Sequence, residues 1–241
     1  MKWLLFTALL YNNAGNAHKQ IQKNLKELGC RYHTQVIGVS KKKRPLLSYV
    51  FPGKTKRVFL ITSGMHGLEK LPVVFSMNLM QRICTKKNSH MISYVFLPIM
   101  NPDAYSQTFR RRNNFEGIDL NRDAFTQKAK ESRALAKYIK TLSVFYYTDI
   151  HSYGNVVISP RKVTPVNKYF IGIVSKQLGF PIYPGLPKGM WINWFSAAKR
   201  NPIAFILELG KSTEPLKPCV DLQKKYLRKM LPRFFNILYV L

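Results

Sequence analysis

His66 and Glu69 stand three positions apart, directly after an apolar run at residues 58–61. A three-residue step in a turn can bring an imidazole and a carboxylate to one point, and the glycines on both sides of His66 allow backbone angles that other residues resist. The pair alone is a weak signal, because it occurs by chance in many proteins. His151 strengthens it, since two histidines and a glutamate form a catalytic zinc set that leaves a fourth position for water. The sequence therefore predicts a zinc site at these three residues.

Two further acidic residues have predicted roles beside this site. Only 11 of the 241 residues are acidic, and an acid in apolar surroundings is costly unless it is paired or bound to metal. Asp149 lies two residues before His151 and could orient its imidazole. Glu208 follows the apolar residues 204–207, and a carboxylate there beside zinc would be a good general base for water. The alternative for Glu208 is an ordinary ion pair with one of the many lysines.

The segment at residues 101–125, NPDAYSQTFRRRNNFEGIDLNRDAF, carries several groups that could recognise a substrate. The planar fork of an arginine suits the recognition of carboxylates and the stabilisation of an oxyanion. Asn121 and Arg122 next to Asp119 would be an unusual combination for a mere surface loop. We therefore expect this segment to contribute to the same site.

The elements that must position these residues follow from apolar patterning. β-branched and aromatic runs predict strands at residues 46–51, 58–62, 92–97, 144–150, 156–159 and 204–207. Helical spacing predicts helices at 71–84, 127–142, 165–178 and 222–231, with a tail after Pro232. This alternation indicates an α/β sandwich over a mostly parallel sheet, in which sites form beyond the carboxyl ends of the strands. His66, His151 and Glu208 each stand at the end of a predicted strand.

Length and composition favour one globular domain with a sizeable core, since 46% of the residues are apolar. The net charge of +28 favours anionic partners: nucleic acid, an anionic membrane or wall, or acidic substrates. No motif for specific nucleic-acid binding accompanies the charge. We expect most of the basic residues, including Lys41-Lys42-Lys43-Arg44, to form solvated faces.

The first 17 residues resemble a secretory signal, with a lysine at position 2, an apolar run at 3–11 and small residues at 15 and 17. The run is too short to span a bilayer as a helix, which needs about 20 residues. The predicted organisation is a signal peptide at 1–17 and a single catalytic domain at 18–241, in a periplasmic or secreted protein without a transmembrane anchor. The alternative is the start of a core helix that continues to residue 28, in a cytoplasmic protein.

Three cysteines lie far apart, in a spacing that is neither a zinc clip nor a dense disulfide framework. A Cys30–Cys219 bridge is open in an oxidising compartment. Cys84 ends a helical pattern, and we expect it to be a buried thiol.

Six motifs occur in an order that is similar to one family: SGMHGLE, NPDAY, RRRNN, GIDLNRD, DIHSYG and ILELG, spread from about residue 60 to 210. Together they resemble the zinc carboxypeptidases of the funnelin type, the carboxypeptidase A-like enzymes, including short bacterial relatives that act on murein peptides. The resemblance implies a three-layer α/β/α sandwich with a mixed, mostly parallel sheet. It also implies one Zn²⁺ ion and hydrolysis of the C-terminal bond of a peptide with a free terminal carboxylate, by a water molecule on zinc that Glu208 activates.

The resemblance assigns residues to roles. The zinc ligands would be His66, Glu69 and His151. Glu208 would be the general base and acid, and Arg112 would polarise the scissile carbonyl, with Arg111 as the alternative because the triple arginine blurs the alignment. Asn121 and Arg122 would hold the terminal carboxylate of the substrate. Tyr183 is a candidate for the tyrosine that caps the substrate in the digestive enzymes.

Several positions depart from the family pattern. Leu68 replaces an arginine of the digestive enzymes, Asp123 follows Arg122 where asparagine is frequent, and Asn193 precedes Trp194 where aspartate is frequent. These departures leave the substrate preference open. Basicity, small size and a signal-like start favour peptides with several carboxylates, such as those of a cell wall, whereas Ile192 near the side-chain pocket would favour an apolar terminal residue.

Three other functions remain as alternatives. An aspartoacylase-like amidohydrolase of small N-acyl amino acids shares several motifs, although NPD and DIHSYG favour the peptidase. A catalytically inactive relative could bind an anionic polymer, although the zinc ligands and Glu208 are all present. A nucleic-acid binder driven by charge alone would show steeply salt-dependent affinity.

Overall fold

The structure is a computed structural model that describes residues 13–85, 90–107, 111–185, 187–199, 202–210 and 220–239. Within them, one mixed sheet of eight strands forms the centre, in the order β1-β2-β4-β3-β5-β8-β6-β7. Its strands are β1 (His33–Val39), β2 (Pro45–Phe51), β3 (Val58–Ser63), β4 (Ser93–Leu97), β5 (Val144–Ser152), β6 (Val156–Ser159), β7 (Ile182–Pro184) and β8 (Ile203–Leu209). The neighbours β4, β3, β5 and β8 run parallel, so the carboxyl ends of β3, β5 and β8 lie side by side.

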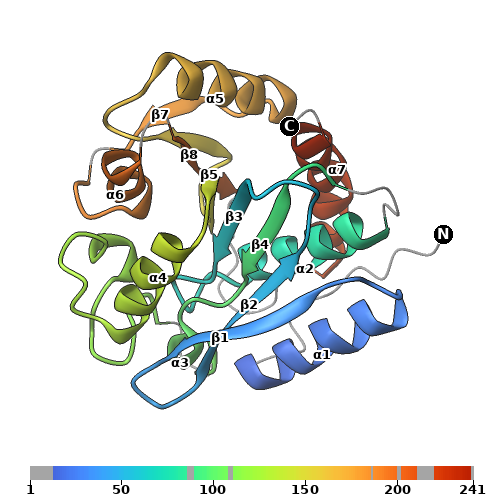
Figure 1. The fold of residues 1–241 in the computed structure, drawn as a ribbon, viewed down its shortest axis with the longest axis vertical. Coiled ribbons are helices and arrows are strands. Elements are labelled where there is room, and N and C mark those ends of the chain that lie inside the picture. Colours follow the sequence, from blue (N-terminus) through green and yellow to red (C-terminus); the bar gives the residue numbers. More distant parts are fainter. Residues whose placement is uncertain are drawn as a thin grey trace.

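Helices cover both faces of this sheet (Figure 1). One face carries α1 (Ala14–Glu27), α2 (Lys70–Thr85), α5 (Pro165–Leu178) and α7 (Val220–Tyr239). The other carries α4 (Lys130–Thr141) and α6 (Trp191–Ala198). The short α3 (Pro102–Tyr105) and a 3₁₀-helix, η2 (Leu120–Arg122), lie in the loops between them. The predicted three-layer sandwich is confirmed. No helix of the described ranges combines the length and the apolar character that a membrane span requires.

The central strands are apolar on both sides because helices cover both faces of the sheet there. In β3, Phe59 and Ile61 pack into the core beneath α2, whereas Val58 and Leu60 face the α4 and α6 side. All six residues of β3 are buried. Continuous apolar runs of this kind predict strands, and all six predicted strands are present, with ends that differ by at most two residues.

The elements absent from the prediction have weak sequence patterns. β1 is an edge strand on which Thr34, Gln35 and Val36 are exposed, so it lacks an alternating apolar face. β7 has three residues, all exposed. The prediction that the last helix ends at residue 231 was wrong: α7 continues through Pro232. The buried residues Leu231, Phe234 and Phe235 hold this helix against the sheet, and their packing offsets a proline cost of about 3 kcal/mol.

α1 crosses the position at which the predicted signal peptide ends. The side chain of Asn13 accepts a hydrogen bond from Gly15 N at the start of the helix, and Ala14 and Ala17 are buried in the core. Residues 1–12 lie outside the described residues. The division at residue 17 stays a prediction, with α1 as an observation in favour of its alternative.

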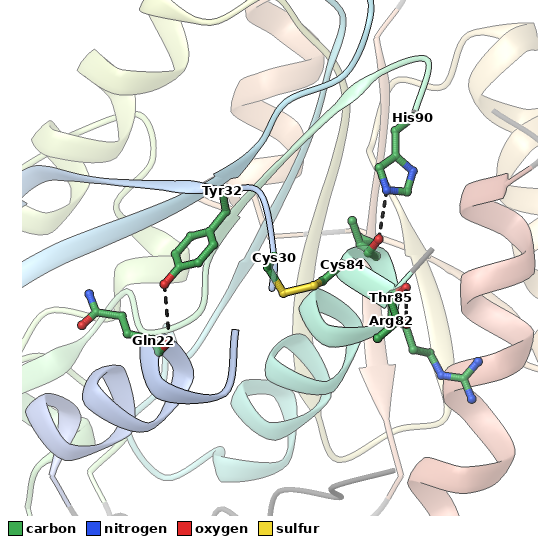
Figure 2. Close-up of a disulfide and its surroundings, with 8 residues drawn as sticks. Gln22, Cys30, Tyr32, Arg82, Cys84, Thr85 and His90 are labelled. Carbon is green, nitrogen blue, oxygen red and sulfur yellow. Dashed lines mark hydrogen bonds between the residues drawn. A yellow bond between two sulfur atoms is a disulfide. The ribbon is translucent and has the colours of Figure 1, made fainter. Parts of the chain in front are cut away.

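The described cysteines form a disulfide that the sequence analysis did not predict. Cys30 precedes β1, Cys84 lies in the last turn of α2, and their sulfurs are bonded, with the two Cα atoms 5.2 Å apart (Figure 2). The expectation of a buried Cys84 thiol is therefore wrong, and Cys30 is not available for the Cys30–Cys219 bridge that the sequence left open. Cys219 itself lies outside the described residues. The Cys30–Cys84 pair is 54 positions apart in sequence, and the packing of α1 against α2 brings the two together.

Candidate metal centre and active site

A tight loop between β3 and α2 places His66 and Glu69 together. Gly64 has a φ of +65°, which residues with a side chain rarely adopt. A Cβ atom on Gly67 would lie 2.4 Å from the backbone carbonyl carbon of Ala104, so only glycine fits against α3. The amide of Glu69 donates to the carbonyl of His66 at 3.0 Å, which closes the turn. The glycines beside His66 therefore serve the geometry that the sequence analysis proposed.

His151 joins this pair from the neighbouring strand β5. Its Nδ1 atom lies 3.0 Å from Oε2 of Glu69 and 3.2 Å from Nδ1 of His66, while Nδ1 of His66 lies 2.6 Å from Oε1 of Glu69. All three side chains are buried, and their potential ligand atoms lie within 4.8 Å of one another. Two imidazole nitrogens and a carboxylate converging in this way match the donor set of a catalytic zinc ion.

The outer nitrogens of both histidines contact carboxylates. Nε2 of His66 lies 3.0 Å from Oδ1 of Asp119, and Nε2 of His151 lies 2.7 Å from Oδ2 of Asp149. An Nε2–H that donates to a carboxylate leaves Nδ1 as the metal-binding atom and fixes the orientation of the ring. Both Nδ1 atoms point to the same centre, so the residues fit a zinc ion on their own geometry.

The charges of the site fit a cation as well. Burial alone would raise the pKa of Glu69, but the charges and hydrogen bonds of His151 and His66 outweigh burial and lower it to about 2. Burial likewise opposes protonation of His151, but Asp149 and Glu69 raise its pKa well above the ordinary value. A metal ion at this centre would replace a proton as the partner of the Glu69 carboxylate.

Glu208 lies on β8, directly across from His151 in the sheet register. Burial raises the pKa of its carboxyl group to about 7, while the two histidines lower it and the carboxylates of Glu69 and Asp149 raise it further. A group with a pKa near neutrality can both take up and release a proton at physiological pH. Glu208 can therefore serve as an acid and a base beside the metal centre.

A cavity of about 440 Å³ opens over these residues. It brings together seven of the residues singled out in the sequence: His66, Glu69, Arg112, Asn121, Arg122, His151 and Glu208. Arg112 rather than Arg111 reaches the cavity; the carbonyl of Arg111 instead accepts a hydrogen bond from Leu68 N at 3.0 Å. Tyr183 does not line the cavity, and its side chain is exposed on the edge strand β7.

Arg112, Asn121 and Arg122 come from the loop region between α3 and α4. Nε of Arg112 donates to Oδ2 of Asp119 at 2.9 Å. The other oxygen of Asp119, Oδ1, accepts from the backbone N–H of Asn121 at 2.9 Å. Nη1 of Arg122 donates to the carbonyl of Asn121 at 2.8 Å. Asp119 therefore connects the His66 ligand, Arg112 and the 3₁₀-helix, and the result is a cavity wall with two guanidinium groups.

Sequence reasoning missed several residues of this cavity. The sequence pattern gave no role to Asp119, although its place two residues before Asn121 was a usable signal. Ser152, Tyr153 and Gly154 follow His151 and form another wall. Apolar side chains complete the lining: Val156, Ile158, Pro184, Pro187 and Met190. Ile192 is fully buried behind this lining, where its Cδ1 lies 3.2 Å from the position of a Cβ on Gly185.

Comparisons with known proteins agree with this geometry. A model of the zinc carboxypeptidase family, Peptidase M14, matches residues 19–169. A search of curated protein sequences gives no significant match. Bovine thrombin-activatable fibrinolysis inhibitor, solved with a tick carboxypeptidase inhibitor, is 16% identical with a TM-score of 0.78, covering 95% of this chain and 96% of its own.

Two other solved structures share the fold. Carboxypeptidase A from Helicoverpa armigera is 15% identical with a TM-score of 0.79, covering 94% of this chain and 72% of its own. A metallo-carboxypeptidase from Burkholderia cenocepacia is 15% identical with a TM-score of 0.73, covering 92% of this chain and 68% of its own.

Proposed function

This chain belongs to the zinc carboxypeptidase family, and on that premise we propose that it hydrolyses the C-terminal peptide bond of peptides with Glu208 as general base. It is a zinc metallocarboxypeptidase, and its cofactor is zinc. The observation that carries the proposal is the placement of Glu208 beside His151 on adjacent parallel strands, in a cavity with two arginines.

His66, Glu69 and His151 would hold the ion through the two Nδ1 atoms and the Glu69 carboxylate. Zinc bound there supplies a Lewis acid that polarises a carbonyl and lowers the pKa of water. Asp119 and Asp149 keep both imidazoles in the orientation that ligation needs.

Glu208 carries the proton transfers. Its carboxylate takes a proton from the attacking water and returns a proton to the leaving amine, and the pKa of about 7 that burial gives this carboxyl group suits both steps. Arg112 donates hydrogen bonds to the oxygen on which negative charge develops, an interaction that strengthens as the carbonyl becomes tetrahedral. Arg122 and Asn121 bind the terminal carboxylate and so restrict cleavage to the last peptide bond.

The wall of the cavity bears on the substrate. Five apolar residues line it, and among the described lining residues the acids are Glu69 and Glu208, which the mechanism already uses. This lining favours an apolar terminal side chain. A second candidate is a murein-type peptide with several carboxylates, which Arg112, Arg122 and the net charge of +28 favour. Parallel assays on phenylalanine- or leucine-ended peptides and on murein peptides distinguish the two.

The decisive test of the mechanism is Glu208→Gln in the zinc-loaded protein. The amide keeps the size of the side chain but cannot accept the proton, so kcat should fall by at least about a hundredfold while the protein keeps one zinc ion. Wild-type turnover in this variant would refute the role of Glu208. Cleavage of N-acetyl-aspartate without cleavage of any peptide would instead support the aspartoacylase-like alternative.

We further propose that the protein works outside the cytoplasm. The Cys30–Cys84 disulfide supports this location, because disulfides persist in oxidising compartments. The signal-like start supports this location from the sequence. The start of α1 at Ala14, before the predicted cleavage position at residue 17, is the observation against a signal peptide. N-terminal sequencing of protein recovered from the periplasm or medium tests both points: an intact cytoplasmic chain would exclude the proposed signal.

An anionic surface is the proposed partner of the basic exterior. α4 exposes four basic residues at helical spacing, Lys130, Arg133, Lys137 and Lys140, whereas its acid, Glu131, is buried. We expect the protein to sediment with murein sacculi or with vesicles containing phosphatidylglycerol at low salt, and to dissociate as ionic strength rises. The nucleic-acid alternative would be favoured if the protein bound DNA as tightly as these anionic surfaces, kept that binding in His66→Ala and showed no peptidase activity.

A further inference from the structure

Tyr226, on the outer helix α7, reaches the end of the strand that carries Glu208. Its hydroxyl accepts a hydrogen bond from the amide of Gly210 at 2.9 Å and donates to Oδ1 of Asn155 at 2.7 Å. Its ring covers Gly210, where an added Cβ would lie 3.0 Å from Cε2 of Tyr226. One hydroxyl group thus connects the exit of β8 with the turn that follows β5.

That turn, Tyr153-Gly154-Asn155, has an unfavourable backbone. Tyr153 has a φ of 107° and Asn155 a φ of 56°, angles that residues with side chains seldom adopt. The amides of Tyr153 and Gly154 both donate to the carbonyl of Leu209, at 2.9 and 3.3 Å. Local strain of this kind persists only where surrounding contacts hold it. The Asn155–Tyr226 contact is one of the contacts that do so.

The turn is also a wall of the active site. Tyr153 and Gly154 line the cavity. A Cβ on Gly154 would lie 3.0 Å from Cβ and 3.5 Å from Cγ of Glu208, so the backbone of the turn packs directly against the stem of that side chain. A shift of the turn would release or displace the Glu208 carboxylate, although no described side chain of α7 lines the cavity.

We propose that Tyr226 is a positioning residue, whose hydroxyl fixes the 153–155 turn against Glu208 and so holds the general base in line for catalysis. The catalytic part of this inference rests on the proposed function; the fixing of the turn does not. Small displacements of a catalytic group cost large factors in rate, so a lost hydroxyl on an outer helix should lower kcat. In the described contacts the Asn121 side chain binds His151 and Trp191 and the Arg122 side chain binds the carbonyl of Asn121, so substrate binding should change little.

The test uses Tyr226→Phe in the zinc-loaded protein, with Tyr94→Phe as the matched control. The Tyr94 hydroxyl also binds α7, by donating to the carbonyl of Leu238 at 2.9 Å, but it lies in β4 and outside the cavity lining. Tyr226→Phe should lower kcat about tenfold and leave KM within about twofold. Amide exchange at Tyr153, Gly154 and Gly210 should accelerate at least about tenfold. Tyr94→Phe should change neither.

A second variant guards against a folding defect. Asn155→Gly removes the acceptor of the Tyr226 hydroxyl but tolerates the positive φ, and it should reproduce the kinetic effect. The double variant should be no worse than the more impaired single variant, because both remove one contact. Unchanged exchange at the turn would overturn the inference, and so would faster exchange with wild-type kcat. If the wild-type protein cleaves no peptide, the proposed function fails, and the exchange data alone decide whether Tyr226 fixes the turn.

Discussion

Nε2 of His151 lies 2.7 Å from Oδ2 of Asp149, two residues earlier on the same face of β5. The other oxygen of Asp149 accepts a hydrogen bond from Thr62 on β3 at 2.7 Å, so the carboxylate is fixed from a second strand. Asp149 is fully buried. Water therefore does not compete for its oxygens, and Asp149 fixes one tautomer and one orientation of the His151 ring.

Asp149→Asn should lower zinc affinity about 10- to 100-fold, because the amide cannot support the same ligand orientation and basicity. Competition with a chelator of known affinity measures the change. Asp103→Asn is the matched control: it is an equally buried aspartate that accepts hydrogen bonds from Ser40 and Arg44 instead of contacting a zinc ligand. Zinc affinity that falls equally in both variants would show a general loss of stability instead.

Gly154→Ala should reduce kcat at least about tenfold while the protein folds and retains zinc. The new methyl group would meet Cβ of Glu208 and Cγ2 of Val156, each at 3.0 Å, and one of them must move. Steady-state kinetics and zinc content check this. Gly172→Ala in α5 is the control, since a Cβ there meets nothing within 4 Å and should stabilise the helix slightly. Full activity in Gly154→Ala would show that Glu208 tolerates displacement.

His18 should make stability depend on pH. Burial lowers its pKa to about 4, and its Nδ1 lies 2.9 Å from the Tyr49 hydroxyl. In the unfolded chain the His18 imidazole takes up a proton near pH 6.5, whereas in the folded protein it is protonated only near pH 4. The free energy of unfolding is therefore highest above pH 6.5. It falls by at most about 3 kcal/mol as the pH falls towards 4, because protonation of His18 favours the unfolded chain.

Urea unfolding at pH 7.5 and 4.5 measures this effect. His18→Gln does not titrate and should lose less stability between the two pH values than the wild-type protein does. His33→Gln, at an exposed histidine on β1, should behave as the wild-type protein. Identical pH dependence in all three proteins would contradict the assignment.

Removal of the Cys30–Cys84 disulfide should lower the free energy of unfolding by about 4 kcal/mol, because the unfolded chain gains the entropy of a loop of 54 positions. The double substitution Cys30→Ala/Cys84→Ala, unfolded in urea, measures the loss. Cys219→Ala distinguishes the pairings. This substitution should leave the urea midpoint of unfolding unchanged. A large loss of stability in that variant would instead support a Cys30–Cys219 bridge.

The sequence by itself determined the parts of the fold that depend on local burial. Strands β3, β5 and β8 are mostly apolar because both of their faces are covered, and His66, His151 and Glu208 could be placed near their ends for that reason. The edge strands β1 and β7 carry no such signal, because exposed strands need no apolar pattern.

Contacts between distant segments were decided only by the tertiary structure. Two adjacent arginines have the same chemistry, and the loop path alone sends Arg112 into the cavity and uses the backbone of Arg111 elsewhere. The pairing of Cys30 with Cys84 and the reach of Tyr226 to Asn155 depend on how α1, α2 and α7 pack on one face of the sheet. Residue types and spacing specify which chemistry is available, whereas the packing of layers fixes which atoms come within bonding distance.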